Sequence, residues 1–259
     1  MNSKIIVFFL FGINFLIVSS GYGASLGSLM NIPLDVTEEE RLSIAGDGSF
    51  ITGKDLETKD GITNEIDESN QVGLKVAYGV VESVSIYAKF GAADWSITNS
   101  VPETIDYENS LYYGAGLTYA YKSETNIIVG GDIQYIMQPE VGVDSLTYAG
   151  RAATNINGLE ADFSELQISV LCGYDITVSE DMHLVPYAGL GYDKFSYEWA
   201  AGSFNAASAI NIASGSLDGD NAVGLIAGTS VNVGSNLNIN LEGRFVSETA
   251  FSFGFNYRF

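Results

Sequence analysis

The chain has 259 residues, a formal net charge of −21, one Cys and one His. So acidic a chain has no basic surface for a phosphate backbone, which excludes a nucleic-acid partner, and 46% hydrophobic residues are too many for a disordered chain. Only 17% of the residues are charged, against about 25% in an average soluble domain, so the acidic and apolar residues must be concentrated in different parts of the chain.

The first 23 residues have the layout of a secretory signal. Lys4 precedes an apolar run over 5–18, and small residues up to Gly23 follow it. The run is shorter than the about 20 residues that a spanning helix needs. We expect cleavage after Gly23, with an uncleaved N-terminal anchor as the alternative. The expected division of the chain is a signal peptide over 1–23, a short periplasmic lead-in over 24–41 and a β-barrel over 42–259.

The rest of the chain alternates between apolar and polar residues with period two, which predicts β-strands. At the end of the chain, for example, Phe251, Phe253, Phe255, Tyr257 and Phe259 share one face. The pattern predicts ten strands, at about 42–51, 71–80, 83–95, 111–121, 126–137, 163–177, 183–197, 221–233, 236–246 and 250–259.

The connections between these strands alternate between short and long, and the four longest are 52–70, 96–110, 138–162 and 198–220. Short periplasmic turns and long extracellular loops are typical of a closed, antiparallel, up-and-down transmembrane β-barrel. A Greek-key sandwich would not sort its connections in this way. The sequence therefore predicts an all-β barrel of ten strands; a soluble secreted sandwich is the remaining alternative.

The two faces of the predicted strands differ in chemistry. One face is aliphatic or aromatic, as outer-membrane lipid requires, while the other is small and polar with isolated charges. We interpret these charges as a lumen network that acts either as a paired plug or as a gated ion path, and the small barrel size favours the plug. The network comprises Asp47, Lys75, Lys89, Asp132, Glu165, Asp175, Asp193, Glu242, Arg244 and Arg258.

Aromatic residues gather near the predicted strand ends, which indicates two girdles at the membrane interfaces. The seventh strand fits this pattern only with a bulge near Asp193 and Lys194, which would return the following aromatic residues to the outer face. The expected interface aromatics are Trp95, Tyr121, Tyr174, Tyr197 and Trp199.

The sequence offers no convincing catalytic set. The single His183 follows a predicted periplasmic turn, where we expect a solvated residue, and Cys172 has the lipid-facing parity of its strand. The carboxylates of 52–70 do not match an EF-hand, so we expect a solvated loop. Half of the 32 acidic residues lie in the four long connections, an acidic crown with divalent cations as candidate partners.

Three segments carry a resemblance to a known family: Pro186–Tyr192, Leu241–Phe245 and Phe255–Phe259. Over about 42–259 the chain resembles small bacterial outer-membrane β-barrel proteins of the OmpA/opacity type. The resemblance implies an eight-strand barrel as the alternative to ten. It also implies that the alternating C-terminal residues, Phe251 to Phe259, are the signal read by the barrel-assembly machinery.

These observations lead to one functional hypothesis and one alternative. The first is a non-enzymatic outer-membrane barrel, monomeric and without a cofactor, that serves envelope structure or surface interaction through acidic loops. The alternative is a narrow porin-like channel for ions or small solutes.

Overall fold

The structure is a computed structural model that describes residues 41–59, 62–99, 103–219, 222–245 and 248–259. The predicted signal segment and nearly all of the lead-in lie outside these residues, so both stay predictions. Within the described part of the chain, no helix has the length and apolar character to cross a membrane.

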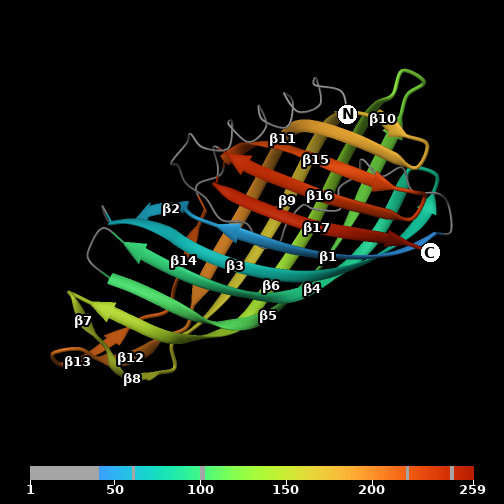
Figure 1. Ribbon diagram of the computed structural model, residues 1–259. Helices are drawn as coiled ribbons and strands as arrows, with labels where there is room; N and C mark the ends of the chain where they lie inside the picture. Colours follow the sequence, from blue (N-terminus) through green and yellow to red (C-terminus); the bar gives the residue numbers. More distant parts are fainter. Residues whose placement is uncertain (1–40, 60–61, 100–102, 220–221, 246–247) are drawn as a thin grey trace.

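Ten antiparallel strands form one closed barrel (Figure 1). Closure is made by β1, which pairs with β17 along one edge and with β3 along the other, so that Asp47 lies between Gly254 and Gly73. The predicted ten-strand barrel is confirmed, and the eight-strand alternative is wrong. The barrel strands are β1 (Leu42–Ile51), β3 (Ile62–Val81), β4 (Val84–Asn99), β5 (Glu103–Lys122), β6 (Ile127–Tyr148), β9 (Glu160–Tyr174), β11 (Met182–Trp199), β15 (Ala222–Val233), β16 (Leu237–Phe245) and β17 (Ala250–Arg258).

The barrel has a turn end, where the short connections lie, and a loop end, where the long ones lie. The four regions that the sequence predicts to be long loops contain strands in the structure. In the expected loop 96–110, for example, β4 and β5 stay paired as far as Asn99 and Glu103. Alternation continues there through Ile97 and Ile105, which explains why pairing continues. The shorter strands are β2 (Lys54–Lys59), β7 (Arg151–Ala152), β8 (Thr154–Asn157), β10 (Ile176–Ser179), β12 (Gly202–Asn205), β13 (Ala209–Ile212) and β14 (Gly215–Asp218).

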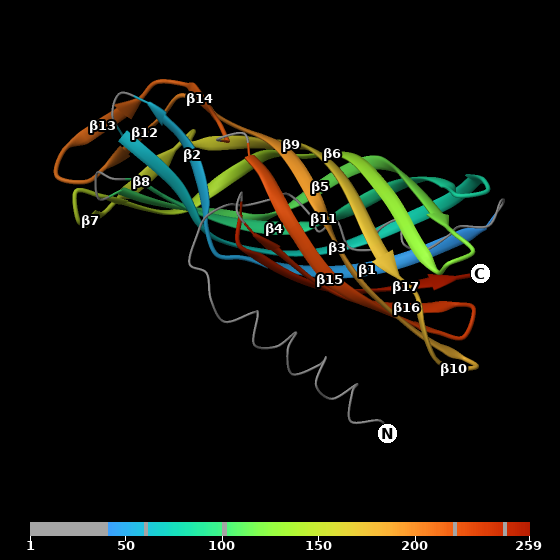
Figure 2. The ribbon, with the colours of Figure 1, turned by 90° about the horizontal axis from the view of Figure 1, so that it is seen from above.

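The wall is much taller on one side than on the other. Strands β3 to β6 run far past the loop end of β16 and β17, and β8, β12 and β13 form a small separate sheet at the far tip (Figures 1 and 2). The tall side therefore projects beyond the part of the barrel in which all ten strands are present.

An apolar band surrounds the outside of the barrel. Val72, Phe90, Leu117 and Phe253 belong to it, and Phe253 keeps 54% of its surface exposed. Beyond the band, towards the loop end, outward positions turn polar, as at Glu108. A band of exposed apolar side chains limited in height is what lipid contact requires.

Inside the wall, tyrosine rings lie across glycines of the neighbouring strand. Tyr87 is paired with Gly116 in this way, and a Cβ on Gly116 would lie 2.4 Å from the Tyr87 ring. Tyr187 lies across Gly228 in the same manner. The missing side chain gives the ring its place against the barrel wall.

Replacing Gly116 by Val should displace the Tyr87 ring and lower the free energy of unfolding by about 1–3 kcal/mol, as overpacking usually does. Urea unfolding of the refolded protein, followed by tryptophan fluorescence, measures the change. The matched control is Ala115→Val, whose side chain points out of the barrel. Equal stability of the two variants would contradict the ring-on-glycine packing.

Candidate functional site

The loop-end half of the lumen is filled by an aromatic layer, which we define as Trp95, Tyr107, Phe163, Phe195 and Tyr197. The rings come from β4, β5, β9 and β11, and all five are buried. Trp95 stacks on Phe163 with centroids 5.1 Å apart, Phe163 stacks on Tyr197 at 5.3 Å, and the hydroxyls of Tyr107 and Tyr197 bond each other at 2.5 Å. Rings from β4 and β5 thus meet rings from β9 and β11 inside the barrel.

Segments from two long connections complete this layer. Leu56 of β2 and Leu217 of β14 are buried in the same cluster, and Leu56 forms an isolated bridge with Gly219. The two connections therefore fold inward over the rings instead of extending into solvent.

The polar edge of Trp95 is satisfied inside the barrel. Its Nε1 donates to Oε1 of Gln138 at 2.7 Å, and the amide of Gln138 donates to the carbonyls of Ala93 and Ser110, each at 2.9 Å. Because buried donors are costly when unpaired, Gln138 on β6 holds the indole in a fixed position.

The expected interface position is wrong for Trp95, Tyr197 and Trp199. Trp95 and Tyr197 face the lumen, while Trp199 packs partly buried against the same core and donates from Nε1 to the carbonyl of Ala213 at 2.9 Å. These strand segments lie beyond the outer apolar band, where the apolar face turns inward.

The expected bulge in the seventh strand is also absent from β11. Tyr187 to Trp199 pair with β9 in unbroken register, so Lys194 points outward and Phe195 inward. Tyr121 and Tyr174 do lie on the outer face at the turn end, with 54% and 50% of their surfaces exposed. Their role at a membrane interface stays a prediction.

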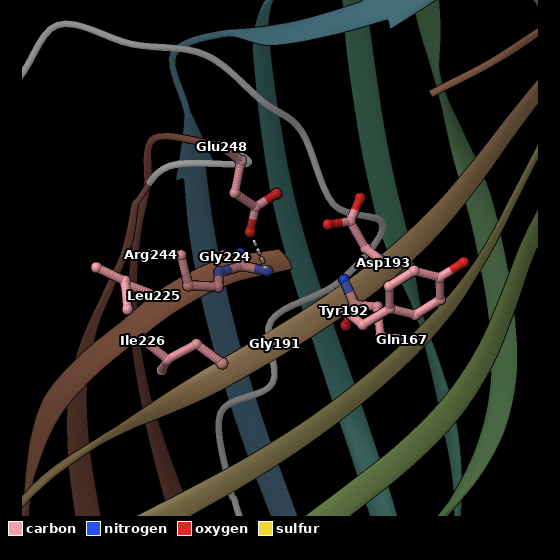
Figure 3. A pocket seen from close by; sticks show the side chains of 9 residues that line it. All are labelled: Gln167, Gly191, Tyr192, Asp193, Gly224, Leu225, Ile226, Arg244 and Glu248. Carbon is pink, nitrogen blue, oxygen red and sulfur yellow. Dashed lines mark ion pairs between the residues drawn. The ribbon is translucent and has the colours of Figure 1, made fainter. Parts of the chain in front are cut away.

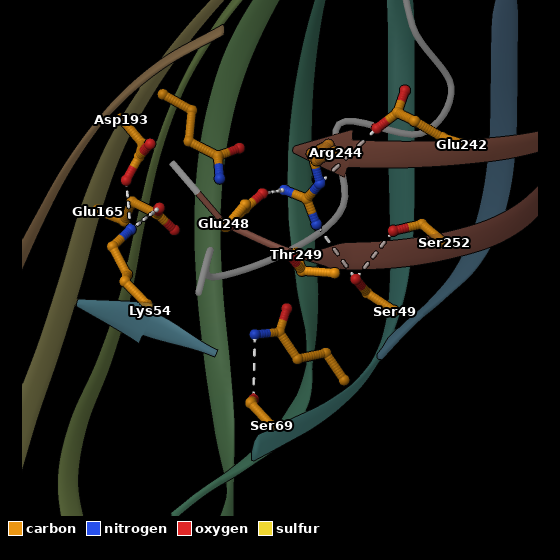
Figure 4. A network of polar contacts seen from close by, with 12 residues as sticks. Ser49, Lys54, Ser69, Glu165, Asp193, Glu242, Arg244, Glu248, Thr249 and Ser252 are labelled. Atoms are coloured by element: carbon orange, nitrogen blue, oxygen red, sulfur yellow. Dashed lines mark hydrogen bonds and ion pairs between the residues drawn. The ribbon is translucent and has the colours of Figure 1, made fainter. Parts of the chain in front are cut away.

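A first buried ion cluster lies directly below the aromatic layer (Figure 4). Lys54 makes ion pairs with Asp193 of β11 and with Glu165 of β9, the latter at 3.5 Å. Its ammonium also lies 5.1 Å from the centre of the Phe195 ring. Lys54 is 1% exposed, so the expectation of a solvated loop is wrong at this position. The one sequence feature that could have indicated this position is the apolar Leu56, which packs in the lumen and directs β2 inward.

A second cluster surrounds Arg244 on β16 (Figure 4). Its guanidinium bonds Glu248 at 2.7 Å, lies 3.9 Å from Glu242 and donates to the Ser49 hydroxyl at 3.2 Å. Ser49 in turn bonds Ser252 at 2.8 Å, which ties β1 to β17 at the closure. Glu248 belongs to a short connection that carried no sequence signal for a lumen position.

Towards the turn end, the remaining predicted charges also meet partners. Asp47 pairs with Lys89 at 3.4 Å. Lys75 lies 3.9 Å from the centre of the Tyr87 ring, and the Tyr87 hydroxyl donates to both oxygens of Asp132 at 3.0 Å. The Tyr187 hydroxyl likewise donates to Glu242 at 3.1 Å, so the tyrosines on glycine also bind the buried carboxylates.

Two of the predicted network residues lie apart from these clusters, at the turn end. Asp175 accepts hydrogen bonds from Lys122 and from His183 Nδ1, the latter at 2.8 Å, so His183 is half-buried and bonded rather than simply solvated. Burial opposes ionisation of Asp175, but these two bonds outweigh it and lower the pKa of this carboxyl. Arg258 is half-buried at the end of β17, where its amide and carbonyl both bond Asn236.

A small pocket lies beside the two ion clusters. A pocket of about 20 Å³ lies at the seam of β11 and β15, between Asp193 on one side and the Arg244–Glu248 pair on the other (Figure 3). That volume holds about one water molecule. Within the described residues, no group of three or more His, Cys, Asp or Glu is placed to hold a metal ion.

Comparison with solved structures identifies the architecture. The translocator domain of the autotransporter NalP from Neisseria meningitidis is similar over 87% of this chain and 91% of that one, with 16% identity and a TM-score of 0.50. The outer membrane protein OprG from Pseudomonas aeruginosa is similar over 87% and 99%, with 13% identity and a TM-score of 0.47. No protein-family model and no curated protein matches the chain. The likeness to the NalP translocator domain, together with the closed ten-strand barrel, gives the chain the fold of outer-membrane β-barrels.

Replacing Lys54 by Met removes the cation from beside Glu165 and Asp193 and should cost about 3–5 kcal/mol of unfolding free energy, because two buried carboxylates lose their partner. Urea unfolding in lipid vesicles measures the loss. Lys194→Met, on the outside of the same region, serves as the control. Adding Glu165→Gln and Asp193→Asn to the Lys54 variant should restore part of the stability, and a Lys54 variant as stable as its control would contradict the cluster.

The inward position of Trp95 and Trp199 can be tested with lipids brominated on the acyl chains. Neither of the two tryptophans of the chain should be quenched, because neither lies on the outer apolar band. A Tyr174→Trp variant, with the new indole on that band, should gain a quenched component. Strong quenching of the unmodified protein would show that the tryptophans lie at the lipid interface and would contradict their inward position.

Proposed function

We propose that the chain is an integral outer-membrane β-barrel with a closed lumen, which acts by presenting its acidic loop end to molecules outside the cell. The observation that carries this proposal is the filling of the lumen. The aromatic layer spans it at one level, and the clusters of Lys54 and Arg244 span it at the next.

Membrane insertion is supported by the outer surface. Apolar side chains surround the barrel, and closure through β1 leaves no strand edge open to lipid. The predicted signal cleaved after Gly23 and the alternating residues Phe251 to Phe259, offered to the barrel-assembly machinery, complete the proposed route to the membrane. We further propose that the barrel is a monomer, with its loop end outside the cell.

A plug explains the lumen charges better than an ion path does. Conduction needs sites that an ion can enter and leave, whereas the charges of Lys54, Arg244 and Lys89 are paired within the barrel. Ten strands also lie nearer to the side-chain-filled barrels of about eight strands than to the open porins of about sixteen. The proposed role is therefore neither transport nor catalysis but surface interaction.

The acidic crown supports the surface role. Half of the 32 acidic residues of the chain belong to the four long connections, whose described parts lie at the loop end. Such a crown would attract divalent cations and cationic partners and repel polyanions.

In planar lipid bilayers the unmodified protein should show no conductance steps, because the paired side chains leave no continuous path. As a companion variant, Glu242→Gln with Arg244→Gln removes one pair while keeping the side chains long. Steps in the unmodified protein whose size or ion selectivity changes in this variant would overturn the closed-lumen proposal in favour of a narrow channel.

A further inference from the structure

A second pocket, of about 170 Å³, lies at the loop end above the aromatic layer. Its floor is formed by Tyr107 and Tyr197 of that layer together with Leu217. Its upper wall is shared with a separate apolar cluster built around Leu146 and Leu159, below the small sheet of β8, β12 and β13. The pocket is thus the space left between two apolar clusters that do not fully meet.

The size and walls of this pocket suit an apolar body of about one ring. Ile97, Ile105, Val143 and Ile212 add further apolar surface to its sides. An engineered apolar cavity of about 150 Å³ in another protein binds benzene, so this volume accepts a single phenyl group or an alkyl group of similar size.

Both charged residues of the pocket favour a positive charge. Glu103 and Glu160 line it together with Asn64 and Asn99, and none of its lining residues, which all belong to the described part of the chain, is basic. Glu160 is exposed, and Glu103 accepts a hydrogen bond from Asn99 at 2.9 Å at the tip of the β4–β5 hairpin. The carboxylates therefore stand at the outer edge of an otherwise apolar space.

Three aromatic rings add a second attraction for a cation. Tyr107, Tyr197 and Trp199 line the pocket, and Tyr197 packs between Phe163 and Trp199, with ring centroids 5.3 and 5.1 Å away. Tyrosine and tryptophan rings attract organic ammonium groups. Carboxylates bind the same charge from the solvent side.

We propose that this pocket is a binding site for small organic ammonium ions that carry an apolar body of about one ring. The apolar body enters between the two clusters, and the ammonium group lies among the rings, near Glu103 and Glu160. The proposal deepens the proposed surface function and rests on it only in assigning the source of the ligand to the outside of the cell.

Isothermal titration of the detergent-solubilised chain with benzyltrimethylammonium tests the proposal. Benzyl alcohol and phenylacetate serve as the neutral and anionic probes of similar shape. We expect saturable binding of the cation, weaker binding of the alcohol and the weakest binding of the acid. Equal or tighter binding of phenylacetate, or no binding of the cation, would overturn the proposal.

Two variants connect the binding to the pocket. Glu103→Gln with Glu160→Gln should weaken cation binding about tenfold, since each exposed carboxylate contributes up to about fivefold, while Glu198→Gln, on the outside of β11, should leave it unchanged. Trp199→Leu should weaken it by about tenfold through loss of a ring face. Unchanged affinity in both pocket variants would place the binding elsewhere and overturn the assignment.

The same preparation separates this proposal from the one on which it rests. Conductance steps combined with ammonium binding would refute the closed lumen but leave the binding site standing. A silent barrel that binds no ammonium would refute the binding site alone.

Discussion

Closure of the sheet is the constraint on which the rest of this structure depends. A strand in hydrocarbon must pair every backbone group, and the pairing of β1 with both β17 and β3 removes the last open edge. Closure also creates an interior, which ten strands make narrower than that of the open porins of about sixteen strands. The character of the protein follows from how this interior is filled.

The interior is filled by layers of different chemistry. At the loop end the rings of the aromatic layer meet inside the barrel. Below them Lys54 binds carboxylates of the neighbouring strands β9 and β11, and Arg244 binds Glu248 and lies near Glu242 of its own strand. Nearer the turn end, Tyr87 and Tyr187 lie across glycines and donate to Asp132 and Glu242. Lys54, Arg244, Asp132 and Glu242 each have a partner inside the barrel, as a buried charge must have to persist.

The height of the wall separates two environments along the same strands. Within the apolar outer band, the lumen face carries the polar and charged residues. Above the band the order reverses: Glu108 and Lys194 point outward, while Trp95 and Phe195 point inward. The tall side thus has polar residues outside and apolar residues inside, as a small water-soluble β-structure has. The pocket lined by Glu103 and Glu160 is a gap in this apolar core.

The sequence by itself determined the ten barrel strands and, along the apolar band, the side of each strand on which a residue lies, because alternation with period two is a local property. Alternation alone therefore assigns Asp47, Lys89, Glu242 and Arg244 to the inner face of the barrel. It could not determine where the membrane ends along a strand, and so Trp95 and Tyr197 were expected at a lipid interface.

Only the tertiary structure decided which loop residues return to the lumen. Lys54 lies there beside Glu165 and Asp193, on strands far from it in sequence, which a local pattern does not record. Glu248 lies there beside Arg244 because the short connection after β16 turns inward, which the alternation of the strand does not show. The acidic residues also divide between what the sequence and what the fold determine. Composition shows that the net negative charge is large, and the sequence places half of the acidic residues in the long connections. The fold alone set Glu103 and Glu160 beside a pocket of aromatic rings, because that meeting depends on the distance between separate strands.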